Sequence, residues 1–140
     1  MIIAWMLHPL RGYGEYSSED NLARAKRWMK WCLQNLQEVE VCADWILWCE
    51  LLDDANPEER ARGLRYDQEM TRRCDMVIVC GGHLSSGMQS DLDIAKTEGK
   101  MILDLTDFGD WPSAHLAVTN EAVLRLRAVL VEKQIRELAD

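Results

Sequence analysis

Residues 75–105 read DMVIVCGGHLSSGMQSDLDIAKTEGKMILDL, a strand, a helix and a second strand in succession. The apolar run over 75–80 predicts a strand that ends at a pair of glycines. Small residues then open a helix over 86–98, and Gly99 ends it. The apolar residues of 100–105 predict the next strand. This order is typical of a βαβ unit, in which a right-handed crossover makes the two strands parallel.

The same alternation extends along the rest of the chain. Strands are expected over 2–7 and 38–43, helices over 18–36, 57–74 and 120–138, and either a short apolar helix or a loop over 45–52. At 140 residues, one domain over 1–140 is expected. The sequence therefore predicts an α/β fold, a three-layer Rossmann-like or flavodoxin-like parallel sheet of about four to five strands flanked by helices.

Composition narrows the classes of partner. The chain has 16 basic and 24 acidic residues and a net charge of −8, which excludes a basic clamp for a nucleic-acid polymer. Its five cysteines are odd in number and lack CxxC spacing, so we expect reduced thiols in a cytoplasmic protein. No apolar run approaches the roughly 18 residues of a membrane span. Six tryptophans, several at helical spacing, favour packing in the core or between subunits, and the second use fits an expected homo-oligomer.

The loops after the first three strands hold the candidate binding residues. In such sheets, ligands bind beyond the carboxyl ends of the strands, where the first and third strands are neighbours. The candidates on these loops are His8, Arg11, Gly12, Asp44, Trp45, Gly81, Ser85, Ser86, Gly87 and Met88. The backbone NH groups at 81–87 suit an anion, and Arg11 would give a second contact to a phosphate. Glycine and serine at these positions also simply form turns.

Asp67 falls at the centre of an apolar helical stripe that includes Leu64 and Cys74. An inward-facing carboxylate must be paired, hydrogen-bonded or raised in pKa, and such groups concentrate at functional sites. Asp67 is therefore a candidate catalytic residue. The alternative is a structural acid bonded to backbone, to Arg11 or to Arg72.

Asp91 lies one turn into the helix over 86–98, at the border of its apolar face. The helix dipole keeps an anion ionised there, which suits a nucleophile or a stabiliser of a cationic transition state. A first-turn acid that only stabilises the helix is the alternative. The three histidines, His8, His83 and His115, adjoin no carboxylate at ligand spacing, so we expect no metal site.

Together these features resemble the nucleoside 2-deoxyribosyltransferase-like superfamily, which includes deoxynucleoside monophosphate N-glycosidases and phage-encoded relatives. The resemblance covers about residues 2–105. It rests on the turn LHPLRGYG after the first strand and on Asp67 in YDQEMTRRCD, eight residues before Asp75. It also rests on SSGMQSD, in which the carboxylate of Asp91 follows Gly87 by four residues.

The resemblance implies cleavage of an N-glycosidic bond, or base transfer, in a small-molecule nucleoside or nucleotide. Asp91 matches the position of the nucleophilic carboxylate, and Asp67 matches that of the acid that contacts the leaving base. Ser85, Ser86, Gly87 and Arg11 would hold a 5′-phosphate. This chemistry requires no metal or organic cofactor.

Two departures from the family favour a second hypothesis. The nucleophile is usually glutamate, and Asp91 is shorter by one methylene, about 1.5 Å. His8 occupies a position that is small, often glycine, in many relatives. These departures favour a weakly catalytic or non-catalytic protein that binds a nucleotide or nucleotide-derived signal, such as a phage counter-defence protein in the host cytoplasm. A structural oligomer without a ligand is the third hypothesis.

Overall fold

The computed structural model describes residues 1–110, 112, 128, 131–132, 135–136 and 138–139. Its elements are β1 (Ile2–Leu7), α1 (Ser18–Asn35), β2 (Val39–Cys42), α2 (Trp45–Leu51), α3 (Pro57–Arg73), β3 (Met76–Val79), α4 (Ser86–Thr97), β4 (Met101–Asp104) and the 3-10 turn η1 (Thr106–Phe108). The predicted elements from 2 to 105 are confirmed to within a residue or so at each end, and 45–51 is a helix. The helix predicted over 120–138 lies largely outside the described residues.

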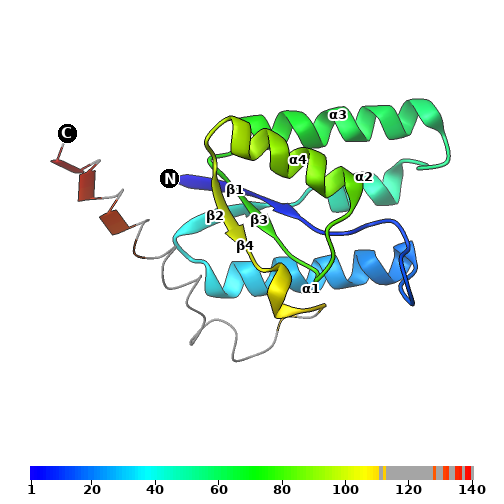
Figure 1. Ribbon diagram of the computed structural model, residues 1–140, viewed down its shortest axis with the longest axis horizontal. Coiled ribbons are helices and arrows are strands. Elements are labelled where there is room, and N and C mark those ends of the chain that lie inside the picture. The colour runs from blue at the N-terminus through cyan, green and yellow to red at the C-terminus, as the bar shows by residue number, and fades with distance from the viewer. Residues whose placement is uncertain (111, 113–127, 129–130, 133–134, 137, 140) are drawn as a thin grey trace.

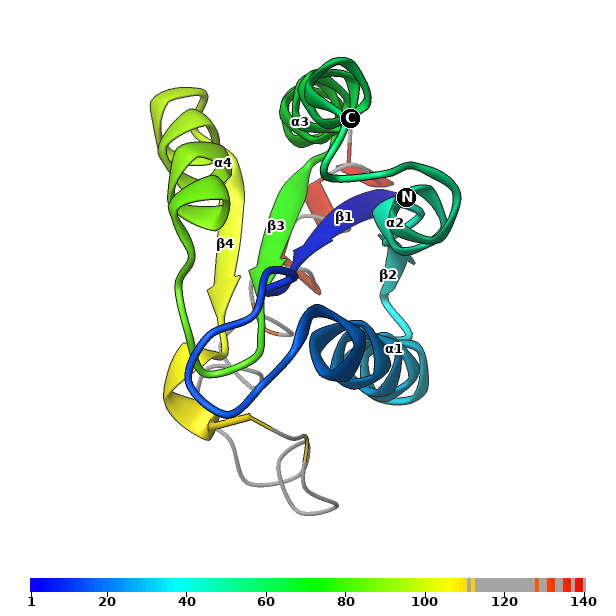
Figure 2. The ribbon, with the colours of Figure 1, turned by 90° about the vertical axis from the view of Figure 1, so that its right-hand side faces the viewer.

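The sheet is parallel, with the order β2-β1-β3-β4. Trp5 in β1 lies opposite Cys42 of β2 on one side and Val77 of β3 on the other. Helix α1 covers one face, and α2, α3 and α4 lie on the opposite side (Figures 1 and 2). This is the predicted three-layer Rossmann-like α/β fold. From β1 the chain continues to β2 at one edge of the sheet, and from β3 it continues to β4 at the other edge. The carboxyl ends of β1 and β3 therefore form the place where a ligand is expected to bind in such a sheet.

Local signals in the sequence fix the helix ends. The Ser17 side chain accepts a hydrogen bond from the Asp20 backbone NH, and the Asp20 carboxylate accepts one from the Ser17 NH, a capping box that starts α1. Asn56 caps α3, and the Ser85 hydroxyl caps α4. Gly99, at φ +69°, follows α4. The Ser85 cap thus fixes the first turn of α4, which lies next to the candidate site described below.

The strands supply a fully buried core. β3 is buried along its whole length, and in β1 only Ile3 is exposed, as expected for parallel strands covered on both faces. All five cysteines are free thiols, three of them buried. Within the described part of the chain, no helix is both long and apolar enough to cross a membrane.

Candidate functional site

A cavity of about 150 Å³ lies beyond the end of β1, bordered by α2, α3 and the first turn of α4. Its lining consists of Trp5, Leu7, His8, Leu10, Arg11, Trp45, Cys49, Asp54, Arg60, Leu64, Asp67, Ser85, Ser86, Gly87, Met88 and Asp91. The fold therefore brings together the predicted site residues, except Gly12, Asp44 and Gly81. Both candidate catalytic carboxyls are among them.

Asp67 and Asp91 reach this cavity from different helices. Asp91 is 7% exposed, and Asp67 is half-buried. Burial raises the pKa of Asp91 to about 6, against the opposing effect of the Arg72 charge. Burial raises the pKa of Asp67 to about 7, and the negative charges of Asp91 and then Asp44 raise it further. Near neutral pH, the site thus combines an ionised Asp91 with a partly protonated Asp67.

The residues proposed as structural partners of Asp67 are engaged elsewhere. Arg11 Nε lies 3.2 Å from Asp54 Oδ2, and Arg72 pairs with Glu69 and Glu98. Among the described residues, none forms a hydrogen bond or ion pair with the Asp67 or Asp91 carboxylate. Both carboxyls are therefore available to a ligand, as a purely structural acid would not be.

The first turn of α4 provides polar groups beside the two acids. The Ser85 hydroxyl accepts a hydrogen bond of 3.2 Å from the Met88 backbone NH, which leaves its own proton free to be donated. The backbone NH groups of Ser86 and Gly87 have no intrahelical acceptor, because the first helical hydrogen bond runs from the Gln89 NH to the Ser85 carbonyl. A side-chain carbon added at Gly87 would meet no atom within 4 Å. The helix terminus can therefore receive a hydroxyl or an anionic group.

His8 contributes to the shape of the site as a neutral side chain. It is 5% exposed, and burial lowers its pKa to about 4. Its Nδ1 lies 2.7 Å from the Pro9 carbonyl oxygen, so Nδ1 carries the proton. Its Nε2 has no partner in the described structure and packs against Gly81, where an added Cβ would lie 2.7 Å away. Gly81, at φ +99°, therefore allows the His8 ring to pack directly against the backbone of the loop after β3.

Asp44 and Gly12 are the other two predicted site residues that do not line the small cavity. Asp44 accepts a hydrogen bond from the Tyr66 hydroxyl, and its charge helps to raise the pKa of Asp67. Gly12 packs against the Tyr16 backbone, where an added Cβ would lie 3.0 Å from the carbonyl oxygen. Asp44 therefore tunes the site, and Gly12 permits a close turn.

Arg24 is a structural anchor that the sequence reasoning missed. It is completely buried on α1. Its guanidinium donates to the Asn21 side chain at 2.7 Å, to the Gly81 carbonyl at 2.8 Å and to the Tyr13 hydroxyl at 3.0 Å. It thereby joins the loops after β1 and β3. The sequence offered one signal for this role, because Arg24 is a charged residue next to Ala25 on the apolar face of α1, and a buried charge needs hydrogen-bond partners.

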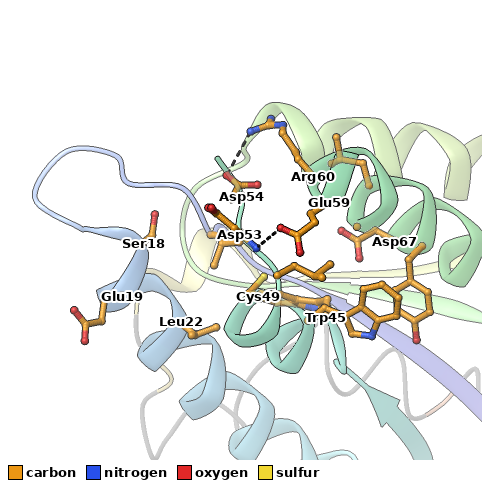
Figure 3. Close-up of a pocket in the computed structure, with 16 residues that line it drawn as sticks. Ser18, Glu19, Leu22, Trp45, Cys49, Asp53, Asp54, Glu59, Arg60 and Asp67 are labelled. Carbon is orange, nitrogen blue, oxygen red and sulfur yellow. Dashed lines mark hydrogen bonds and ion pairs between the residues drawn. The ribbon is translucent and has the colours of Figure 1, made fainter. Parts of the chain in front are cut away.

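A larger cavity of about 370 Å³ adjoins the first, and Asp67, Trp45 and Cys49 line both. Its walls come from α1, α2, α3 and the loop before α3 (Figure 3). The Trp45 indole NH donates to a backbone carbonyl at 2.8 Å, and Trp48 stacks on Tyr66 at 4.4 Å. These fixed aromatic rings make a largely apolar, preformed chamber, which is typical of small-molecule sites. The sequence did not identify Trp48 or Tyr66 as site residues.

Charged groups form part of the wall of the larger cavity. Arg60 lies 3.4 Å from Asp54, and Glu59 accepts a hydrogen bond of 3.1 Å from the Asp53 backbone NH. In Figure 3, Glu59 and Asp67 lie along α3, whereas Glu19 on α1 points away. In the described part of the chain, no three His, Cys, Asp or Glu side chains are grouped to hold a metal ion.

Comparison with known proteins assigns the family. No curated protein matches the chain. Residues 3–104 match the family described as a domain of unknown function, DUF7768. The match extends from β1 to β4 and so includes the sheet, both cavities and the two carboxyls. Because it covers most of the chain, this protein belongs to the DUF7768 family.

Proposed function

We propose that this protein cleaves the N-glycosidic bond of a nucleoside or nucleotide. The observation that carries the proposal is the pair Asp67 and Asp91, two unpaired carboxyls in one cavity whose pKa values differ in the order that acid and nucleophile require. Enzymes that break a bond at an anomeric carbon commonly use two carboxyl groups of this kind. The resemblance to nucleoside 2-deoxyribosyltransferase-like proteins supports the same reaction.

Asp91 is the nucleophile in this proposal. Its carboxylate attacks the anomeric carbon as the bond to the base breaks, and it stabilises the oxocarbenium-like transition state. Water then hydrolyses the glycosyl ester, or a second base attacks it and completes a transfer. The nearby Arg72 charge favours the ionised form of Asp91.

Asp67 is the general acid. Raising its pKa to about 7 keeps a proton available at neutral pH, and the proton passes to the base as the bond breaks. Asp67 lines both cavities, so a nucleoside that spans them would have its glycosidic bond close to this residue. The small cavity would then hold the sugar, and the larger one the base.

The first turn of α4 is the proposed contact for the sugar hydroxyls or a 5′-phosphate. Ser85, Ser86 and Gly87 line the small cavity and offer a hydroxyl and free backbone NH groups. Arg11 also lines it, but a phosphate must first compete with Asp54 for its guanidinium. An unphosphorylated sugar faces no such competition.

Ligand binding without turnover is the second candidate function. It is favoured by His8, whose buried ring lines the small cavity and occupies space where a sugar would bind. The short side chain of Asp91 favours it as well, because a displaced nucleophile loses much of its rate.

Release of free base, followed by chromatography, tests the proposal. The substrates are ribonucleosides, 2′-deoxyribonucleosides and their 5′-monophosphates. Base release supports cleavage, and exchange with an added second base identifies transfer. Thermal stabilisation by a member of the panel without any release would instead support the binding function.

A further inference from the structure

We propose that Glu59 selects bases that carry an amino group on the edge opposite the glycosidic bond. The inference deepens the proposed function and rests on it, because it takes the larger cavity as the chamber for the base. Adenine and cytosine carry such an amino group. Hypoxanthine and uracil carry a carbonyl oxygen at the same place.

The spacing of Glu59 and Asp67 fits a base lying between them. Both residues belong to α3 and line the larger cavity, and they are eight residues apart, which is about 12 Å along the helix axis. Two carboxyls that project from positions about two turns apart into one cavity can contact opposite edges of one planar ring system, each through a hydrogen bond of about 3 Å. With the glycosidic nitrogen near Asp67, the opposite edge of the base meets Glu59.

Glu59 offers a hydrogen-bond acceptor to that edge. Its Oε2 accepts from the Asp53 backbone NH at 3.1 Å, which holds the side chain in place. Its second oxygen has no hydrogen bond in the described structure. An ionised carboxylate accepts hydrogen bonds and cannot donate them. An amino group therefore satisfies Glu59, whereas a carbonyl oxygen would face it with like partial charge.

Two donors of the same chamber are already used. The Trp45 indole NH donates to a backbone carbonyl, and the Tyr66 hydroxyl donates to an aspartate. The Arg60 guanidinium donates through Nη1 to Asp54 at 3.4 Å (Figure 3). The Trp45 indole NH and the Tyr66 hydroxyl are therefore not available to a carbonyl edge. A carbonyl edge would leave the second oxygen of Glu59 without a partner from the base, which lowers the affinity for that analogue.

Matched substrate pairs test the inference. Adenosine is compared with inosine and cytidine with uridine, each also as the 2′-deoxynucleoside, for kcat/KM of base release and for binding by calorimetry. The wild-type protein should favour the amino member about tenfold or more. Glu59→Gln keeps the contact to the Asp53 NH but adds a donor, so the preference should fall to about twofold. Glu58→Gln, the same change at the exposed neighbouring residue, should retain the wild-type preference.

The outcomes separate this inference from the proposed function. Equal use of both members by the wild-type protein, or a preference that survives Glu59→Gln, overturns the role of Glu59 while cleavage stands. Tighter binding of the amino members that disappears in Glu59→Gln, with no base release from any substrate, supports Glu59 and overturns cleavage. Absence of both binding and release overturns both.

Discussion

Asp67 on α3 and Asp91 on α4 line one cavity, and the Asp91 charge adds to burial in raising the pKa of Asp67 to about 7. Two carboxyls in one poorly solvated space resist simultaneous ionisation, because like charges would then lie close together. The pair therefore carries about one proton near neutral pH. In the proposed reaction, this order of ionisation makes Asp91 the nucleophile and Asp67 the acid.

The rate of base release should have a narrow pH optimum. Asp91 must be ionised and Asp67 protonated, so kcat/KM should be highest between about pH 6 and about pH 7. It should fall about tenfold per pH unit on either side. Measurement of kcat/KM from pH 4 to 9 checks the profile. A rate that rises steadily to pH 9 would show that no protonated Asp67 is needed.

Asp67→Asn should stabilise the folded protein at alkaline pH. Burial raises the pKa of Asp67 in the folded state to about 7, against about 4 in the unfolded chain. The folded state thus binds the proton more tightly, and wild-type stability falls as pH rises from about 4 to about 7. Removing the charge should raise the free energy of unfolding at pH 8 by up to about 4 kcal/mol.

Urea unfolding of both proteins at pH 4 and pH 8 measures this effect. The difference between wild type and Asp67→Asn should be small at pH 4 and large at pH 8. A variant that is less stable than the wild type at pH 8 would instead identify Asp67 as a structural acid with a favourable partner.

Gly81→Ala should destabilise the protein and disturb the site. A residue with a side chain at φ +99° costs about 1–2 kcal/mol, and the added Cβ would also lie 2.7 Å from His8 Nε2. Gly99→Ala is the matched control, since it has φ +69° but no atom within 4 Å of an added Cβ. Both variants should lose stability in urea, and only Gly81→Ala should weaken nucleoside binding. Equal binding by the two would mean that His8 does not shape the site.

Gly87→Ala should leave the fold intact and impair the site. Gly87 lies in the first turn of α4 without backbone strain, and an added Cβ would enter open space at the small cavity. Alanine favours the helix by up to about 1 kcal/mol. A methyl group that displaces the sugar should lower kcat/KM about tenfold or more. Full activity in a stable variant would place the ligand away from this turn.

The sequence predicted those parts of the structure that local patterns determine. Hydrophobic periodicity located the strands and helices, and the caps at Ser17, Asn56 and Ser85 located three helix starts. Asp67 and Asp91 were identifiable because each is an acid on or beside an apolar stripe. Their meeting in one cavity followed from the order of the parallel strands.

Local sequence patterns could not predict contacts between residues that are far apart in the chain. Arg11 pairs with Asp54, which lies 43 residues along the chain, and no local signal indicates that partner. Glu59 reads as a first-turn acid that complements the helix dipole, so its position at the larger cavity was not expected. Arg24 also depends on partners from three separate segments.

The most direct test of the account compares Asp91→Asn with Asp93→Asn. Asp93 is exposed on the same helix and bonds only to the Gln89 side chain among the described residues, so both variants remove one charge from α4. We expect Asp91→Asn to lose base release by about a thousandfold or more while still binding nucleoside. Asp93→Asn should remain within about twofold of the wild-type rate. Base release that persists in Asp91→Asn would contradict the assignment of Asp91 as the nucleophile.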